Sequence, residues 1–133
     1  MGENTGSPER VVAGFIAAVE RKDVAAAVEL LSDDISYENM PIDPVRGRDN
    51  VRQVLEGFLA PATSVDWRIV SQFSSGPTVV NERVDRFEIN GGWLELPVAG
   101  FFEVVDGRIR LWRDYFDMGT YMRRITELMT PSS

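Results

Sequence analysis

The chain has 133 residues, of which 44% are hydrophobic, and its 14 basic and 21 acidic side chains give a formal net charge of -7. Its length suits one globular domain and its apolar fraction is too high for a disordered chain, so we expect a single domain over residues 1–133. The negative charge disfavours binding to nucleic acids or anionic membranes, because both are polyanions. No apolar run approaches the roughly 20 residues of a membrane span and no signal-peptide pattern is present, which favours a cytoplasmic protein.

Cysteine and histidine are both absent from the sequence. Their absence excludes Ser-His-Asp and Cys-His nucleophile systems, zinc sites of the usual Cys and His type, and any disulfide. Acid and base chemistry must therefore come from Asp, Glu or Tyr side chains, from Lys22, or from water that these groups hold.

Helical periodicity dominates the first half of the chain. Ser7 before Pro8 is typical of a helix start, and apolar residues then recur every three or four positions until Lys22. A period of two over residues 35–40 predicts a strand, which Pro41 ends. The predicted helices in this half cover residues 8–21, 24–31 and 50–59.

The second half of the chain has the period of two that is typical of strands. In one predicted strand this alternation places Trp67 and Phe73 on the same face. Asn90-Gly91 and Asp106-Gly107 indicate tight hairpin turns, because Asn, Asp and Gly accept positive φ angles. The predicted strands cover residues 65–73, 78–89, 93–105 and 108–116, and a helix over residues 119–129 follows, with Asp117 as its cap.

The order of these elements predicts an α+β protein. Helices that precede a mixed or antiparallel sheet pack on one of its faces. A curved sheet of this kind is able to wrap into a cone around a pocket.

Charged residues interrupt the apolar face of the strand predicted over residues 78–89. Arg83 and Asp85 share the face of Phe87, which should point to the core. Burying an unpaired charge costs on the order of several kcal/mol, so we expect these two residues to pair with each other.

Two other strands also carry polar residues on inward faces. In the last strand, Asp114 lies between two bulky aromatic residues, Trp112 and Phe116. Tyr37 and Asn39 share one face of the first strand. The polar residues expected inside the sheet are therefore Tyr37, Asn39, Arg83, Asp85 and Asp114.

Two carboxylates beside one guanidinium form an acid-base set. Burial and mutual repulsion should keep a proton on either Asp85 or Asp114, so that one is an acid and the other a base. Arg83 stays charged and orients both, while Tyr37 and Asn39 are suited to hold a water against the ionised carboxylate. A purely structural network of buried ion pairs explains the same residues equally well.

Three motifs together resemble the limonene-1,2-epoxide hydrolase family: Tyr37-Glu38-Asn39-Met40-Pro41, Glu82-Arg83-Val84-Asp85 and Trp112-Arg113-Asp114-Tyr115-Phe116-Asp117. The resemblance includes the helix entry at Gly47-Arg48-Asp49 and spans most of the chain. It implies a cone-shaped α+β fold of the nuclear-transport-factor-2-like type, with helices over a deep apolar pocket. It also implies a homodimer that uses no cofactor and no metal.

The resemblance implies a reaction and residue roles as well. In that family an Asp-Arg-Asp set adds water to an epoxide in one step, without a covalent intermediate, and gives a vicinal diol. On the matching positions Asp114 is the base, Asp85 the acid and Arg83 the bridge, while Tyr37 and Asn39 hold the water. The lack of histidine agrees with this, because epoxide hydrolases with an Asp nucleophile commonly need a His-activated water to cleave the ester intermediate.

The expected substrates are water and a small or medium apolar epoxide, cyclic and terpene-like. Apolar residues at strand spacing are expected to line the pocket, and Phe73 is expected at its mouth. The expected lining residues are Phe87, Leu94, Leu96, Val98, Trp112 and Phe116.

Two other functions suit the same fold. An isomerase or cyclase acting on a ketone-containing steroid or polyketide uses an Asp base, but leaves Tyr37 and Asn39 without a role. A non-catalytic ligand-binding module predicts that neutral isosteres of both Asp residues change stability alone.

Overall fold

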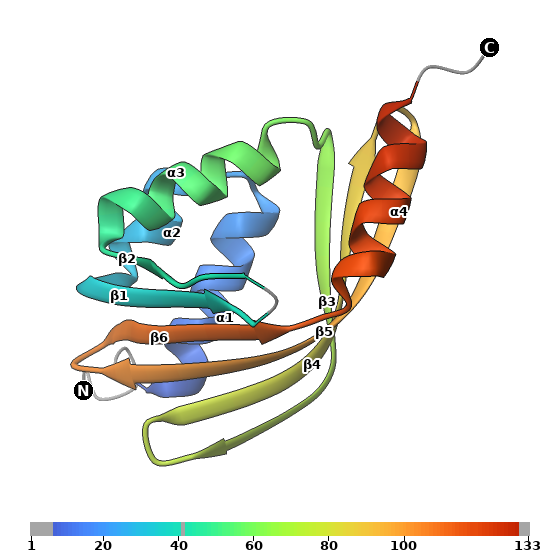
Figure 1. The fold of residues 1–133 in the computed structure, drawn as a ribbon. Coiled ribbons are helices and arrows are strands. Elements are labelled where there is room, and N and C mark those ends of the chain that lie inside the picture. The colour runs from blue at the N-terminus through green and yellow to red at the C-terminus, as the bar shows by residue number, and fades with distance from the viewer. Residues whose placement is uncertain (1–6, 41, 131–133) are drawn as a thin grey trace.

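A strongly curved sheet is the framework of the protein in a computed structural model, which describes residues 7–40 and 42–130 (Figure 1). Within these residues six strands join in the order β2-β1-β6-β5-β4-β3, so the sheet has two free edges and is not a closed barrel. Neighbouring strands are antiparallel, except that β1 and β6 run parallel. The strands are β1 Leu31–Asn39, β2 Val45–Arg46, β3 Ser64–Ser75, β4 Thr78–Ile89, β5 Gly92–Val105 and β6 Arg108–Tyr115.

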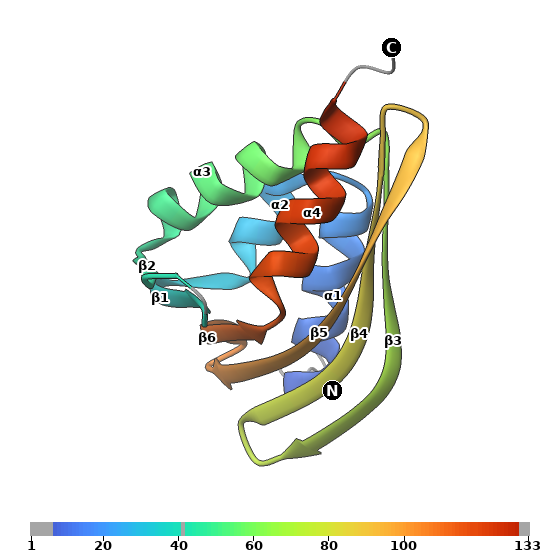
Figure 2. The same cartoon turned by 45° about the vertical axis from the view of Figure 1, so that its right-hand side comes forward.

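Helices cover the concave side of this sheet (Figures 1 and 2). α1 (Pro8–Glu20), α2 (Val24–Glu29) and α3 (Arg48–Leu59) precede most of the strands in the chain. α4 (Met118–Met129) follows β6 and packs beside β5. The predicted α+β class with a mixed, curved sheet is therefore confirmed. No helix in the described part of the chain is long and apolar enough to cross a membrane.

Two helix starts have the predicted caps. The Ser7 hydroxyl accepts a hydrogen bond from the backbone N–H of Arg10 at 3.3 Å, and Pro8 occupies the first helical position. The Asp117 carboxylate accepts from the backbone N–H of Thr120 at 2.9 Å. Side-chain oxygens thus satisfy N–H groups that a helix start leaves unpaired.

The second helix ends earlier than the sequence pattern predicts. α2 stops at Glu29, and Leu31 already belongs to β1 because it pairs with Ile109 of β6. Nη2 of Arg48 donates to the Leu31 carbonyl at 2.7 Å and holds this strand start in place. Strand pairing therefore overrides a helical pattern at the end of a short helix. The predicted strand end at Pro41 lies outside the described residues.

Both predicted hairpin turns are present. The φ angles are 53° at Asn90 and 81° at Gly91, and 53° at Asp106 and 77° at Gly107. Two successive residues with positive φ suit the twist of the flanking strands. The strand predicted over residues 78–89 has the same bounds as β4.

A bulge in β3 overturns the strict alternation predicted for residues 65–73. The register against β4 shifts between Ile69 and Ser71, so the residues after the bulge turn to the opposite face. Trp67 is buried, whereas Phe73 lies on the outer face and is 71% exposed. The prediction that Phe73 shapes the pocket mouth is therefore wrong.

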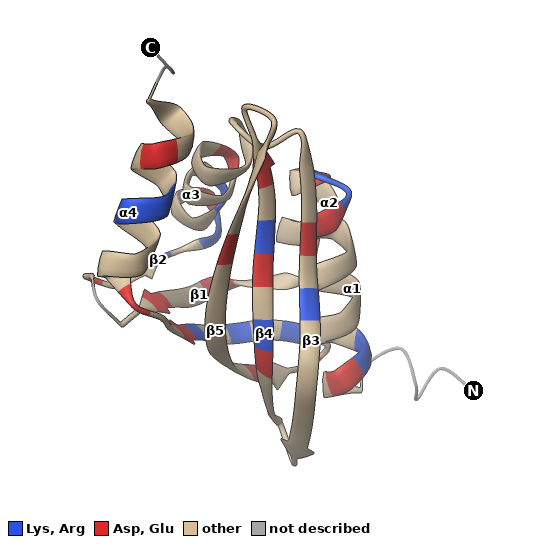
Figure 3. Ribbon diagram, turned by 90° about the vertical axis from the view of Figure 1, so that its right-hand side faces the viewer, with Lys and Arg blue, Asp and Glu red and all other residues tan. Residues whose placement is uncertain are grey.

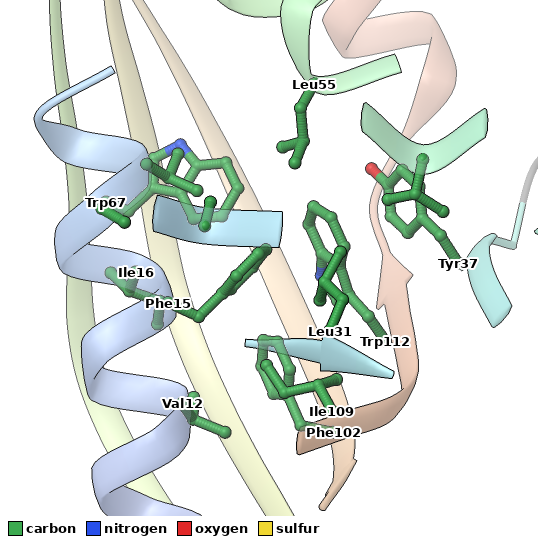
Figure 4. Close-up of a cluster of buried hydrophobic side chains, with 14 of the residues drawn as sticks. Val12, Phe15, Ile16, Leu31, Tyr37, Leu55, Trp67, Phe102, Ile109 and Trp112 are labelled. Atoms are coloured by element: carbon green, nitrogen blue, oxygen red, sulfur yellow. The ribbon is translucent and has the colours of Figure 1, made fainter. Parts of the chain in front are cut away.

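An aromatic cluster forms the core beneath the helices (Figure 4). Trp112 of β6 is completely buried in this cluster, with the Phe15 ring edge-on at 5.0 Å and the Phe102 ring parallel at 6.4 Å. The Tyr37 ring stacks on Trp112, with ring centroids 3.8 Å apart. Packing in the core therefore fixes the orientation of the Tyr37 ring.

Acidic and basic residues follow one another along β4 (Figure 3). Strand alternation sends Glu82 and Arg86 outward, and Arg86 pairs there with Glu95 at 2.9 Å. Arg83 and Asp85 point inward, and their exposed fractions are 0% and 4%. The prediction that these two charged side chains of β4 lie on the inward face of the sheet is therefore confirmed.

Candidate active site

Strand β5 separates the charged residues of β4 from Asp114 of β6. In the sheet register, Gly100 of β5 lies between Asn81 of β4 and Asp114. A Cβ atom added to Gly100 would overlap Nη1 of Arg83 and lie 2.9 Å from Oδ1 of Asp114. Glycine at this position therefore allows Arg83 to reach Asp114 across β5.

Arg83 joins the two carboxylates. Its Nε and Nη2 donate to the two oxygens of Asp85, at 2.9 and 3.1 Å. Nη2 also donates to Oδ2 of Asp114 at 3.1 Å, and Nη1 donates to Oδ1 of Asn81 at 2.8 Å. The Trp67 ring lies against the guanidinium, 5.0 Å from its central carbon. Arg83 therefore holds Asp85 with two hydrogen bonds and Asp114 with one.

The two carboxylates outnumber the guanidinium, and all three side chains are almost fully buried. Burial raises the pKa of Asp114 to about 6, against the lowering effect of Arg83 and with a further increase from the charge of Asp85. Burial also raises the pKa of Asp85, again against Arg83. Although burial acts against it, the two carboxylates raise the pKa of Arg83, which stays charged. The carboxylate pair therefore holds a proton to higher pH than exposed carboxylates do.

Strand β1 supplies two uncharged polar side chains beside Asp114. The parallel register sets Asn39 opposite Asp114, and Tyr37 lies two residues before Asn39. Burial, with the charge of Asp114, raises the pKa of Tyr37 well above its usual value, so its hydroxyl stays protonated. Oδ1 of Asn39 and Oδ1 of Asp114 are buried, and neither has a hydrogen-bond donor among the described residues. A buried acceptor without a hydrogen bond costs about 1–3 kcal/mol of stability. A single small donor such as water would satisfy both oxygen atoms.

A mostly apolar cavity of about 330 Å³ adjoins these groups. Tyr37, Asn39, Asp85 and Asp114 line it, whereas Arg83 lies behind the two carboxylates. The predicted pocket residues that line it are Phe87, Leu94, Leu96, Val98 and Phe116. No cluster of three or more side chains suited to hold a metal ion occurs among residues 7–40 and 42–130.

Trp112 is the predicted pocket residue that lies elsewhere. It is not part of the cavity wall, and its exposed fraction is 0%. It shares the inward face of β6 with Asp114, but α1 and the other core aromatics cover it at that end of the cone. Trp112 therefore affects the site through the Tyr37 ring that stacks on it and through its indole N–H, which lowers the pKa of Asp114.

Two helices complete the cavity wall. Their lining residues are three or four positions apart, so one face of each helix turns to the cavity. α3 and the loop after it contribute Val54, Gly57, Phe58 and Pro61, and α4 contributes Met118, Tyr121, Ile125 and Met129. The helical spacing of apolar residues in α4 is a sequence signal that predicts such a face, but it does not reveal what the face covers.

Asn81 is a site residue that sequence reasoning did not single out. It shares the inward face of β4 with Arg83, is 1% exposed, and accepts a hydrogen bond from Arg83. Its Nδ2 donates to Oε1 of Gln72 at 3.3 Å. The signal that points to it is its place two residues before Arg83 in an alternating strand.

Comparison with known proteins identifies the family. The model of the limonene-1,2-epoxide hydrolase catalytic domain matches residues 6–127 of the chain. This chain belongs to the limonene-1,2-epoxide hydrolase family. Epoxide hydrolase EphG of Mycobacterium tuberculosis is 32% identical to this family member over 125 residues, which cover 91% of the chain and 83% of EphG.

Solved structures share the fold of this limonene-1,2-epoxide hydrolase family member. An LEH-like epoxide hydrolase from M. tuberculosis aligns with a TM-score of 0.77 and 32% identity, over 94% of this chain and 96% of that one. A putative SnoaL-like polyketide cyclase from Shewanella denitrificans aligns with a TM-score of 0.81 and 15% identity, over 90% of this chain and 97% of that one. Because the cyclase is only 15% identical to this chain, its structural match shows a common fold alone. The family and the cone fold predicted from the sequence are thus confirmed.

Proposed function

We propose that the protein adds water to an epoxide in one step and releases a vicinal diol, with Asp114 as the general base and Asp85 as the general acid. The observation that carries this proposal is the pair of buried carboxylates that share Arg83 at the polar end of an apolar cavity. Membership of an epoxide hydrolase family supports the same reaction class.

Asp114 is assigned as the base because the groups that would hold a water lie beside it. A water that donates to Oδ1 of Asp114 and to Oδ1 of Asn39 satisfies the two unmet acceptors. The Tyr37 hydroxyl, which stays protonated, donates to one lone pair of the water oxygen. The other lone pair is then free to attack a substrate in the cavity. These neighbours support Asp114 as the base, and its raised pKa makes it a stronger base than an exposed carboxylate.

The proposed step forms one C–O bond, breaks another and moves two protons. The water oxygen attacks an epoxide carbon while Asp114 takes a proton from that water. The C–O bond of the ring breaks while Asp85 gives its proton to the epoxide oxygen. Asp114 loses its negative charge while Asp85 acquires one, so the total charge beside Arg83 stays constant. Return of the proton from Asp114 to Asp85 after the diol leaves restores the enzyme.

The cavity wall supports an apolar substrate. Apart from Tyr37, Asn39 and the two carboxylates, the lining is aliphatic and aromatic, with the hydroxyl of Tyr121 at one side. A cavity of about 330 Å³ is large enough for a small or medium epoxide, cyclic and terpene-like, such as limonene-1,2-epoxide. An isomerase or cyclase would leave Tyr37 and the unmet acceptor of Asn39 without a role, so this site favours hydrolysis over isomerase or cyclase chemistry.

Hydrolysis in ¹⁸O-labelled water, with enzyme in excess over limonene-1,2-epoxide, tests the proposed direct attack. We expect the diol from the first turnover to carry one ¹⁸O atom, because its new oxygen comes from water. Mass spectrometry of the diol measures the label. As a control, enzyme pre-incubated in labelled water and reacted in ordinary water should give unlabelled diol.

Two results would contradict the proposal. A first-turnover diol without ¹⁸O would show that an enzyme carboxylate attacks the ring. Absence of any diol from limonene-1,2-epoxide, cyclohexene oxide and a long-chain epoxide would rule against hydrolysis.

We further propose a homodimer that forms through the outer face of the sheet. Phe73, Val80 and Phe101 lie in one row across β3, β4 and β5 on this face. Phe101 packs edge-on against Tyr115 at 5.7 Å, and Tyr115 is 42% exposed. An apolar surface of this kind is typical of an interface between subunits.

The Phe101→Glu variant is expected to be monomeric at micromolar concentrations at which the wild type is dimeric. A charge buried in the interface would weaken association, because it loses its hydration without a partner. Sedimentation velocity measures the change, with Met122→Glu as a control because Met122 is 51% exposed on α4. A Phe101→Glu variant that stays dimeric would exclude this face as the interface.

A further inference from the structure

Arg83 distributes its hydrogen bonds unequally among three acceptors. Asp85 receives two of them, whereas Asp114 and Asn81 receive one each. The bond to Asn81 is the shortest, at 2.8 Å from Nη1 to Oδ1. Oδ1 of Asp114 has no donor among the described residues. A guanidinium can bind a carboxylate with two parallel hydrogen bonds, and Nη1 and Nη2 of Arg83 could bind Asp114 in this way. Only Nη2 does so, because Nη1 donates to Asn81.

Nη1 of Arg83 and Oδ1 of Asp114 lie near the same small space over β5. A Cβ atom added to Gly100 would overlap Nη1, and would lie 2.9 Å from Oδ1 of Asp114 and 3.2 Å from Oδ1 of Asn81. No side chain of β5 fills this space, because residue 100 is a glycine. A guanidinium released by Asn81 would therefore be free to turn Nη1 toward Oδ1 of Asp114.

The orientation of the Asn81 amide is also determined by its neighbours. Its Nδ2 donates to Gln72 of β3 at 3.3 Å, so its oxygen faces Arg83. Asn81 is 1% exposed and does not line the cavity. Asn81 therefore contacts Arg83 and is not placed to touch a substrate in the cavity.

We propose that Asn81 is a positioning residue, which by accepting the Nη1 hydrogen keeps Arg83 from binding Asp114 with two hydrogen bonds and so leaves Oδ1 of Asp114 free to take a proton from water. This inference rests on the proposed hydrolysis. It assigns Asn81 a role in the reaction that is separate from the packing of β4.

The charges around Asp114 determine the sign of the expected effect. Arg83 and Asp85 face it from β4 and Tyr37 faces it from β1, while Glu20 of α1 acts on Asp85. Burial raises the pKa of Asp114, and Arg83 opposes this increase. A second bond from Arg83 would favour the carboxylate form further, so loss of the Asn81 oxygen should lower the pKa of Asp114 and weaken it as a base.

Asn81→Val and Asn81→Thr form a matched pair for the test. Val and Thr have the same shape and both favour strands, but Thr keeps a hydroxyl that accepts from Nη1. For Asn81→Val we expect the acidic limb of the kcat/KM profile to move by about one pH unit to lower pH, and kcat at the plateau to fall about tenfold. KM should stay within about twofold of the wild type, since Asn81 does not line the cavity. Asn81→Thr should keep the acidic limb near that of the wild type.

A titration without substrate separates this inference from the proposed function. The ¹³C-carboxyl resonance of Asp114, assigned by its loss in Asp114→Asn, reports the midpoint directly in each variant. A lower midpoint in Asn81→Val than in both Asn81→Thr and the wild type supports the positioning role, even if the wild type forms no diol and hydrolysis is thereby excluded. An unchanged midpoint, or a lower kcat with an unmoved acidic limb, would overturn the inference. If Asn81→Val does not fold, Asn81→Ala and Asn81→Ser give the same comparison.

Discussion

The Asp114→Asn variant is expected to form diol about 10²–10⁴ times more slowly than the wild type, because general-base catalysis contributes a factor of that size to the rate. The variant should still fold, since the Asn oxygen is able to accept the Nη2 hydrogen that Oδ2 of Asp114 accepts at 3.1 Å. Gas chromatography of the diol measures the rate. Asp33→Asn is the control, because Asp33 is a surface carboxylate with a 93% exposed side chain and should leave the rate unchanged.

The same variant is expected to be more stable than the wild type above pH 6. Burial raises the pKa of Asp114 from its ordinary value of 3.8 to about 6, so the folded state disfavours the charged form. The wild type therefore loses stability as the pH rises from about 4 to about 6, whereas the Asn variant has no such group to ionise. We expect a difference of roughly 2–3 kcal/mol in the free energy of unfolding above pH 6, which vanishes below pH 4.

Urea unfolding at pH 4 and at pH 7.5 measures this difference. Full activity in Asp114→Asn would remove Asp114 as the base. A variant that is inactive but less stable than the wild type at pH 7.5 would show that the carboxylate contributes to the fold rather than costing stability.

Removal of the guanidinium is expected to have the largest effect on stability. Arg83→Met leaves Asp85 and Asp114 buried with no cation between them, whereas Arg83 now contacts them at 2.9 and 3.1 Å. Loss of one partner of a buried ion pair costs about 3–5 kcal/mol, so we expect a loss of that size at pH 7.5. The loss should be smaller at pH 4.5, because protonated carboxyl groups are neutral and no longer repel each other.

A triple variant separates charge from packing in this prediction. Arg83→Met combined with Asp85→Asn and Asp114→Asn has no buried charge at the site, and it should recover most of the lost stability while remaining inactive. Urea unfolding and circular dichroism measure both variants. An Arg83→Met protein within about 1 kcal/mol of the wild type at pH 7.5 would contradict the view that the site is held by this arginine.

Much of the site is predictable because polar residues on an apolar strand face stand out. Alternation alone places Arg83 and Asp85 on the inward face of β4, and the structure has them there, almost fully buried. Trp112 shows where this reasoning ends. The inward direction of its side chain follows from alternation. Whether that side chain packs in the core or lines the cavity depends on helices elsewhere in the chain.

Local patterns determined most of the helices and strands, the two hairpins and the inward direction of the polar residues. They did so because the period of a segment, its caps and the φ angles of its turns depend on neighbours in the chain. The tertiary structure alone decided the bulge in β3 that turns Phe73 outward, and the parallel pairing that sets Asn39 beside Asp114. The tertiary structure also places Gly100 between β4 and β6, where the absence of a side chain lets Arg83 reach Asp114. These features depend on the register between strands that are distant in the chain, and no single strand carries a signal for its partner's register.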